Sequence, residues 1–202
     1  VLRGFDRCGP VRLGETVVVQ GAGPVGLSAV LVAKQAGARD VIVIDGVESK
    51  LEVARSLGAT ATVLLSDSPE ERRRQIYDIA GPSGPSLVVE AAGFLPAFSE
   101  GVDLTGIHGR YVILGLWGAI GTQPISPRDM TTKNITIAGA TFPKPKHYHG
   151  AMHLAAQLQN KVPLASLVTH RYAIEDAGKA LDAVHHGKVI KAVIDPELSP
   201  TS

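Results

Sequence analysis

The sequence predicts an α/β fold in which a doubly wound parallel sheet of six strands, ordered 3-2-1-4-5-6, is covered by helices on both faces. Two observations predict it. Short runs of β-branched and apolar residues recur along the chain, and each is followed by a segment with helical spacing. Strands that are apolar throughout and alternate with helices are typical of a parallel sheet buried on both sides. Right-handed crossovers then place the helices in two layers. The expected strands are Thr16–Gln20, Val41–Asp45, Ala61–Leu64, Leu87–Ala91, Tyr111–Leu114 and Ile135–Ala138.

Local signals mark the helices between these strands. A first helix is expected in the opening segment VLRGFDRCG. The helix Pro24–Ala36 starts with a proline, whose missing N–H costs nothing in a first turn. The helix Glu48–Leu57 is followed by Gly58, a residue type that favours helix ends. Ser68, with a glutamate three residues later, forms a capping-box signature for a helix that runs to about Ala80.

The pattern changes after the sixth expected strand. A proline-rich basic loop, TFPKPKHYHG, is expected before a long helix over about Tyr148–Gln159. A short strand near Leu167–Tyr172, a helix over Ile174–His185 and a strand over Val189–Ile194 follow, and the polar tail is expected to fray. We therefore expect a doubly wound domain over residues 1–160 and a smaller C-terminal segment over residues 161–202.

Charge and cysteine content exclude several classes of partner. Lys and Arg number 20 against 19 Asp and Glu, which gives a net charge of +1 and is too balanced for a protein that binds nucleic acid or a membrane surface. The densest basic run, Arg72–Arg74, follows two glutamates and is expected to form a solvated helix face. A single cysteine, Cys8, allows no internal disulfide, which fits a cytoplasmic protein. No apolar run approaches the roughly 18 residues of a membrane span.

The stretch QGAGPVG joins the first strand to its helix and carries Gly21, Gly23 and Gly26 in a GxGxxG pattern. Gly21 would allow the tight turn, Gly23 would let a pyrophosphate approach the backbone, and Gly26 would let the helix pack on the strand. The start of the helix offers unpaired N–H groups and the positive end of its dipole to phosphates. Asp45 ends the second strand 19 positions after Gly26, close to the spacing of about 20 that a dinucleotide site requires.

The carboxylate of Asp45 would accept hydrogen bonds from ribose hydroxyls and would repel a 2′-phosphate, so the sequence predicts NAD rather than NADP as cofactor. Two other interpretations stay open at this point. The glycine turn could be purely structural, with a solvent-facing Asp45. A methyltransferase also carries an acidic residue after its second strand, although the six-residue glycine pattern with Pro24 favours a dinucleotide.

Longer stretches of the sequence are also informative. Four segments stand out in this order: VRLGETVVVQGAGPVGLSAVLVAKQAGARDVIVID, SKLEVARSLGAT, VVEAAG and THRYAIEDAGKALDAVHHGKVIKAVI. Together they resemble the zinc-type medium-chain alcohol dehydrogenase family, over residues 1 to about 195. Sorbitol- and threonine-dehydrogenase-like members are more similar than quinone reductases. The chain departs from the family at Ser86, where an Asp often precedes the fourth strand, but this position is a surface turn.

The resemblance implies further contacts with a nicotinamide cofactor, in what would be a Rossmann domain. Lys50 matches a basic residue near the adenosine ribose, and Lys191 matches one that reaches the pyrophosphate. Ala91–Ala92 matches an apolar wall beside the cofactor's ribose. Leu114–Leu116 matches a segment whose backbone meets the nicotinamide carboxamide, and Ala140–Phe142 matches the backbone on the other side of that ring. The full set expected to bind NAD is Gly21, Gly23, Pro24, Val25, Gly26, Asp45, Lys50, Ala91, Ala92, Leu114, Gly115, Leu116, Ala140, Thr141, Phe142 and Lys191.

The same resemblance implies an N-terminal catalytic domain that supplies zinc ligands and a proton relay. Because the chain starts with Val1 and carries none of these motifs, we expect a fragment with no catalytic residue and no metal site, zinc being confined to the parent protein. Cys8 is then a packing or surface thiol. His147, His149 and His153 are expected to be solvated rather than to bind zinc. The chain alone is expected to bind NAD without turnover.

The resemblance also implies partners. Leu167–Tyr172 and Val189–Ile194 would return to the catalytic domain, and Met130–Ala138 would pair across a two-fold axis, which predicts a homodimer or homotetramer. The parent's substrate is expected to be a small alcohol or polyol, with Trp117 and the Phe142 region as candidates for one side of its pocket. Two alternatives remain open: a stand-alone dinucleotide-binding or redox-sensing module, and a fragment of a zinc-free quinone reductase, against which Asp45 argues.

Overall fold

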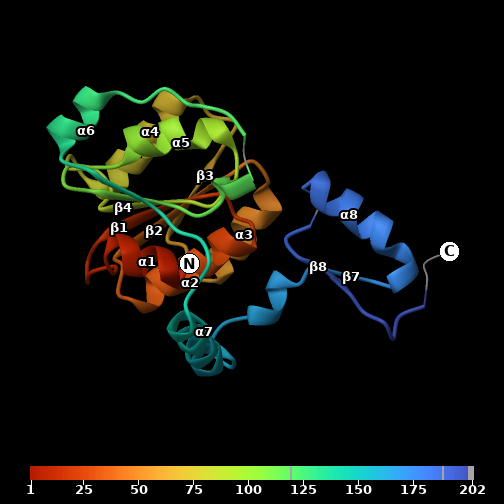
Figure 1. Cartoon of the computed structure of the whole chain (residues 1–202). Helices are drawn as coiled ribbons and strands as arrows, with labels where there is room; N and C mark the ends of the chain where they lie inside the picture. The colour runs from red at the N-terminus through yellow and green to blue at the C-terminus, as the bar shows by residue number, and fades with distance from the viewer. Residues whose placement is uncertain (119, 188, 200–202) are drawn as a thin grey trace.

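The computed structural model of the chain describes residues 1–118, 120–187 and 189–199. Six strands form one sheet in the order β3-β2-β1-β4-β5-β6, with every neighbouring pair parallel (Figure 1). Both the number and the order of the strands are those predicted from the sequence. The strands are β1 (Thr16–Gln20), β2 (Asp40–Asp45), β3 (Ala61–Leu64), β4 (Leu87–Glu90), β5 (Arg110–Ile113) and β6 (Thr136–Gly139).

The register explains why the strands are apolar throughout. Val18 of β1 lies between Ile42 of β2 and Val88 of β4, and all three are fully buried. Val17 and Val19 point to the opposite face and belong to a second hydrophobic cluster. Because successive side chains alternate between faces, each strand contributes to two cores.

Helices cover both faces of the sheet (Figure 1). Residues of the first three helices pack into one hydrophobic cluster, and residues of the next three pack into the other. The first set is α1 (Leu2–Cys8), α2 (Pro24–Gln35) and α3 (Glu48–Ser56); the second is α4 (Pro69–Ala80), α5 (Leu95–Leu104) and α6 (Pro127–Lys133).

Several helix boundaries follow the predicted signals. The Ser68 side chain accepts a hydrogen bond from the Glu71 N–H at 3.2 Å and caps α4. The Glu71 carboxylate, however, bonds to Arg74 and Gln75, so only one half of the expected capping box forms. Gly58 follows α3 with φ +110°, the left-handed conformation that favours glycine after a helix.

Three short helices were not predicted from the sequence: α5, α6 and the 3₁₀ turn η1 (Leu116–Gly118). α5 contains a proline and an internal glycine, LPAFSEGVDL, and α6 has only seven residues. Such segments give weak helical periodicity, although both helices carry a proline in the first turn, where it is favourable.

The prediction of a basic loop before residue 148 was wrong, because α7 (Pro145–Leu158) begins three residues earlier. Pro145 takes the first helical position after Lys144, and the His147 ring accepts the Lys144 N–H at its Nδ1 atom, 2.8 Å away. Pro145 therefore starts the helix rather than preventing it.

The remaining elements form a small C-terminal lobe, which Figure 1 shows beside the sheet and its helices. The predicted strand near Leu167–Tyr172 is split into a 3₁₀ turn and a strand, and the last strand begins at Ala192 rather than Val189. β7 and β8 pair in parallel, His170 opposite Ala192. The elements are η2 (Leu164–Leu167), β7 (His170–Tyr172), η3 (Ile174–Asp176), α8 (Ala177–His185) and β8 (Ala192–Ile194).

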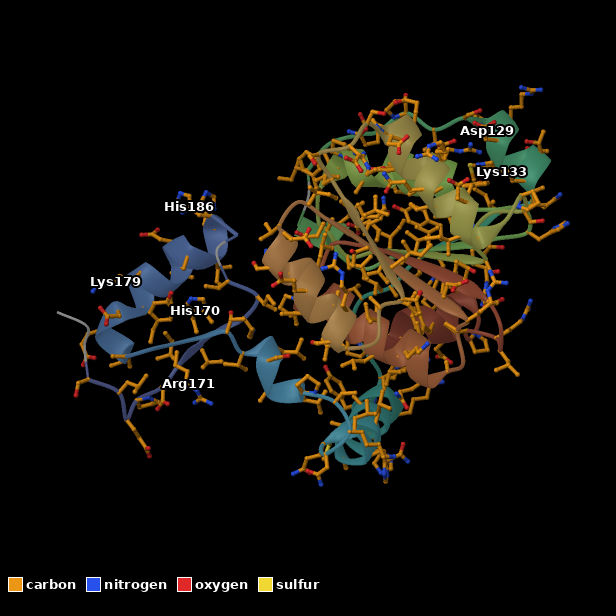
Figure 2. All side chains as sticks on the ribbon, turned by 180° about the vertical axis from the view of Figure 1, so that it is seen from behind. Asp129, Lys133, His170, Arg171, Lys179 and His186 are labelled. Atoms are coloured by element: carbon orange, nitrogen blue, oxygen red, sulfur yellow. The ribbon has the colours of Figure 1, made fainter. Side chains whose placement is uncertain are left out.

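The lobe is joined to the main body chiefly through apolar side chains. Ile190 is buried in the cluster under α1, α2 and α3, and Leu164 and Leu167 pack against it. In contrast, Leu181 of α8 is 72 % exposed. Figure 2 labels His170, Arg171, Lys179 and His186 on the lobe, beside the main sheet and its helices. Among the described helices, none is long and apolar enough to cross a membrane.

Candidate functional site

The parallel sheet gathers five of the predicted segments at one edge. Because all six strands run in the same direction, the loops that follow β1, β2, β4, β5 and β6 leave from the same end. β1 and β4 are neighbours although two strands separate them in sequence. This is the point where the strand order reverses, and open α/β sheets bind ligands in the crevice at such a point.

Two glycines of the loop after β1 are required by close backbone packing. Gly21 adopts φ +95°, and a Cβ added to it would lie 2.8 Å from the Ala92 Cα atom. A Cβ on Gly26 would lie 1.8 Å from the Gly21 carbonyl oxygen. The turn and the helix–strand contact therefore both need glycine, as the pattern predicts.

Gly23 differs from these two glycines because the space beside its Cα atom is open. It precedes α2 as the N-cap with ordinary dihedral angles, φ −77° and ψ −177°, and an added Cβ would meet no atom within 4 Å. Pro24 and Val25 form the first turn beyond it, and Val25 is 42 % exposed. Open space in front of the unpaired N–H groups of a helix start fits the phosphates of a dinucleotide.

Asp45 is bonded to the glycine loop itself. Its Oδ2 atom accepts the Ala22 N–H at 2.7 Å, and its Oδ1 atom accepts the Val47 N–H at 2.9 Å. Sequence reasoning predicted a ribose-binding role and missed this bracing role. Each carboxylate oxygen has two lone pairs, so these two bonds leave acceptor capacity for a ribose hydroxyl.

The predicted segments after β4 and β5 lie against each other. Between them is Glu90, the fully buried last residue of β4, which sequence reasoning missed. Its Oε1 atom accepts the Gly93 N–H at 2.7 Å, and its Oε2 atom accepts the Gly115 N–H at 2.9 Å. Burial, and then the charge of Glu90, raise the pKa of the Tyr111 hydroxyl. The signal in the sequence was a charged residue that closes an apolar strand, LVVE.

The segment after β6 reaches the same edge. The Ala140 N–H donates to the Ile113 carbonyl at 3.1 Å, which ties it to the end of β5. Thr141 follows, and Phe142 is 83 % exposed with φ +49°, a left-handed conformation uncommon for an aromatic residue. The side chain of Trp117, the other candidate for a pocket wall, lies outside the described residues.

The two predicted lysines, Lys50 and Lys191, come from outside the strand ends. Lys50 lies on α3, and its Nζ atom would be 3.8 Å from a Cβ added to Gly187, in the loop after α8. Lys191 is exposed and follows the buried Val189 and Ile190. Within the described part of the chain, neither side chain forms a hydrogen bond or an ion pair with residues 21–26.

A groove of about 570 Å³ adjoins the first turn of α2. Pro24, Val25 and Ser28 form one wall, and α7 forms the opposite wall with Leu154 and Leu158. Its lining is mostly aliphatic, and its ionisable side chains are Arg3, His147 and Tyr148. An apolar groove of this kind does not bind phosphates, which leaves the open space at Gly23 as the better pyrophosphate site.

The histidines of α7 are not all solvated, which corrects the expectation for His147. His147 is buried, and its Nε2 atom lies 3.2 Å from the Asp6 Oδ2 atom. His149 and His153 are exposed, with ring centroids 4.5 Å apart. Cys8 is buried, and burial raises the pKa of its thiol. No cluster of three or more His, Cys, Asp or Glu suited to a metal ion occurs among the described residues.

Comparison with known proteins shows the family. Residues 24–157, more than half of the chain, match the family model described as zinc-binding dehydrogenase. The chain is 67 % identical over 199 residues to 5-exo-hydroxycamphor dehydrogenase of Pseudomonas putida, covering 98 % of this chain and 55 % of that protein. It is 33 % identical over 190 residues to sorbitol dehydrogenase 1 of Saccharomyces cerevisiae, covering 91 % of this chain and 52 % of that protein. The chain thus spans about half the length of these relatives.

Comparison with solved structures shows the same fold in related dehydrogenases. An alcohol dehydrogenase from Thermotoga maritima superposes with a TM-score of 0.86 at 33 % identity, covering 96 % of this chain and 53 % of that one. A zinc-binding dehydrogenase from Sinorhizobium meliloti bound to NADP superposes with a TM-score of 0.81 at 27 % identity, covering 96 % of this chain and 56 % of that one. In sequence and in fold, therefore, the chain belongs to the zinc-binding dehydrogenase family.

Proposed function

We propose that this chain is the cofactor-binding half of a zinc-dependent alcohol or polyol dehydrogenase that uses NAD(H) in preference to NADP(H). The observation that carries the cofactor proposal is the glycine loop. Gly21 and Gly26 are packed too closely for a Cβ, whereas Gly23 faces open space at the start of α2. This distribution suits a loop whose backbone is approached by a pyrophosphate.

The preference for NAD(H) is supported by Asp45. A carboxylate beside the glycine loop can accept hydrogen bonds from the adenosine ribose, but it repels a phosphate at the 2′ position. The segments after β4, β5 and β6 would then lie along the nicotinamide half, with Lys50 and Lys191 near the ribose and the pyrophosphate. Bound nicotinamide supplies hydride transfer, and this chain's residues hold and orient it.

Among the described residues, no group of three or more His, Cys, Asp or Glu is placed to hold a zinc ion. For the whole protein we propose oxidation of an alcohol to a ketone: the carbinol carbon gives a hydride to NAD⁺, and the hydroxyl gives its proton to solvent. The 67 % identity to 5-exo-hydroxycamphor dehydrogenase supports an alicyclic secondary alcohol of that kind as the substrate.

The proposal also covers the oligomeric state of the protein and its location in the cell. β6 is an edge strand of the main sheet, and its four residues are exposed or only partly buried. An uncovered edge strand readily pairs with another chain, which supports a homodimer or homotetramer through this region. The one cysteine is a free thiol, which supports a cytoplasmic location.

Replacing Gly23 tests the cofactor site. Gly23→Ala puts a methyl group into the open space, and Gly178→Ala on α8 is the matched control, because a Cβ there also meets no atom within 4 Å. Both variants should fold like the original chain. Calorimetric titration with NADH should show binding to the original chain and to Gly178→Ala, and binding about tenfold weaker or worse, ~1.4 kcal/mol or more, to Gly23→Ala. Equal affinities in all three would reject the loop as the site.

The substrate proposal is tested on the complete protein. Formation of NADH from NAD⁺ would be followed by absorbance with 5-exo-hydroxycamphor, sorbitol and L-threonine at equal concentrations. We expect the bicyclic alcohol to have the highest kcat/KM. Preference for sorbitol or threonine would reject the substrate proposal and leave the cofactor proposal standing.

A further inference from the structure

Glu90 has an unusual environment for a carboxylate. It has no exposed surface, and no other acidic side chain in the described part of the chain is buried so completely. No Lys or Arg of the described residues lies within ion-pair distance of it. Burying a charge without a counter-charge is costly unless hydrogen bonds replace the lost water. The buried carboxylate of Glu90 must therefore be compensated by hydrogen bonds.

Backbone N–H groups of two loops supply these hydrogen bonds. Oε1 accepts the Gly93 N–H of the loop after β4, and Oε2 accepts the Gly115 N–H of the loop after β5, at 2.7 and 2.9 Å. The Glu90 carbonyl also accepts the Leu114 N–H at 2.9 Å. One residue thus holds both segments at the carboxyl edge of the sheet.

These loops are packed backbone against backbone. A Cβ added to Gly115 would lie 2.6 Å from the Gly93 nitrogen and 3.0 Å from the Glu90 Oε1 atom. The contact continues to the first loop, because the Gly21 turn presses against Ala92. A shift of either segment would therefore change the wall of the proposed cofactor site.

A carboxylate suits this place better than its neutral analogue. An ionised Glu offers two acceptor oxygens and no donor, whereas Gln offers one acceptor oxygen and one NH₂ donor. Facing two N–H groups, Gln would satisfy one loop and oppose the other. Hydrogen bonds to an ionised acceptor are also shorter and stronger than neutral ones.

We propose that Glu90 is a positioning residue for the nicotinamide half of the cofactor. It fixes the separation between Ala91–Gly93 and Leu114–Leu116, the segments proposed to face the nicotinamide ribose and carboxamide. The adenosine half depends on the glycine loop and Asp45 instead. This inference rests on the proposed function.

The test compares two ligands on Glu90→Gln. NADH carries the nicotinamide, and ADP-ribose lacks it but keeps the adenosine and pyrophosphate. Calorimetry should show NADH binding weakened about tenfold or more, while ADP-ribose affinity stays within about twofold of the original. Glu100→Gln is the matched control, because Glu100 is also a largely buried glutamate, but it lies on α5 and pairs with Arg72 of α4 at 2.7 Å. That variant should bind both ligands normally.

The outcomes separate the two proposals. If the original chain binds neither ligand, the proposed function and this inference both fall. If it binds both and Glu90→Gln weakens them equally or not at all, only the role of Glu90 is rejected. Should Glu90→Gln not fold, the amide NMR signals of Gly93 and Gly115 in the original chain decide. They should shift with NADH and not with ADP-ribose, and equal shifts with the two ligands would overturn the inference.

Discussion

The carboxylate of Asp45 accepts a hydrogen bond from the Ala22 N–H at 2.7 Å, so the end of β2 braces the glycine loop after β1. This relationship gives Asp45 two separable properties. Its oxygens hold the loop through hydrogen bonds, and in the proposed function its negative charge would repel a 2′-phosphate. Asparagine keeps an acceptor oxygen and removes the charge, whereas alanine removes both, so the two substitutions separate these effects.

Replacement of Asp45 should change cofactor preference. Asp45→Asn should improve NADPH binding relative to NADH because the repulsion of the 2′-phosphate is lost. Asp45→Ala should also weaken NADH about tenfold, the scale of one lost charged hydrogen bond of ~1.5 kcal/mol or more. Fluorescence titration with both cofactors measures this. Asp40→Asn, at the opposite end of β2, is the control. If Asp45→Ala lowers both affinities by the same factor, Asp45 does not discriminate between the cofactors.

Gly26 should be far less tolerant of a methyl group than Gly23. An added Cβ at Gly26 would lie 1.8 Å from the Gly21 carbonyl oxygen, so the helix and the turn would have to separate. We expect Gly26→Ala to lower the free energy of unfolding by ~1–3 kcal/mol or more, the usual range for overpacking. Urea unfolding measures it, with Gly23→Ala expected to stay near the original value. A Gly26→Ala chain as stable as the original would contradict the packing shown here.

The sequence predicted the strands of the main sheet well because hydrophobic burial on both faces dictates their composition. Val17, Val18 and Val19 favour a buried strand for β1, and six strands with right-handed crossovers suggest the order 3-2-1-4-5-6. The sequence predicted the turn at Gly21 for a similar reason, since few residue types tolerate φ +95°. Strong local constraints are visible in a single sequence.

The sequence did not predict side-chain roles that depend on contacts with residues far away in the sequence. The Glu90 carboxylate accepts hydrogen bonds from the Gly93 and Gly115 N–H groups. Gly115 is 25 residues away in the sequence, and no local pattern predicts that pairing. The expected solvated run Arg72–Arg74 was wrong for Arg72, whose partner Glu100 lies on another helix. His147 was expected in solvent, but α7 packs it against Asp6. Tertiary contacts decide such cases, and periodicity does not encode them.

Arg72 provides the next prediction. It forms an ion pair with Glu100 at 2.7 Å and donates to the carbonyls of Leu65 and Asp67, and its side chain is only 7 % exposed. Arg72→Ala should lower the free energy of unfolding by about 3–5 kcal/mol because it leaves a buried carboxylate unpaired. Arg74→Ala removes a side chain that is 62 % exposed, and it should lower the free energy of unfolding far less, because exposed ion pairs contribute little to stability. Similar losses in the two variants, measured by urea unfolding, would contradict a buried role for Arg72.

The contact between α1 and α7 predicts a dependence on pH. Hydrogen bonds from Lys146 and then His147 hold the pKa of Asp6 below its ordinary value of 3.8. The Nδ1 atom of His147 accepts the Lys144 N–H, so Nε2 carries the proton and donates to Asp6. Arg3 lies 4.0 Å from the same carboxylate. A folded-state pKa below the unfolded one means that the ionised group stabilises the fold above the unfolded pKa and loses this effect as pH falls.

Asp6→Asn should therefore lower Tm at neutral pH, where the native carboxylate is ionised and bonded to both side chains. The difference in Tm from the original chain should narrow as the pH falls below about 4, because Asp6 becomes protonated first in the unfolded state and then in the folded state. Thermal unfolding followed by circular dichroism across this range measures the difference. A Tm difference that stays constant down to the lowest pH would assign the effect of the substitution to packing, since only a titrating carboxylate produces the narrowing.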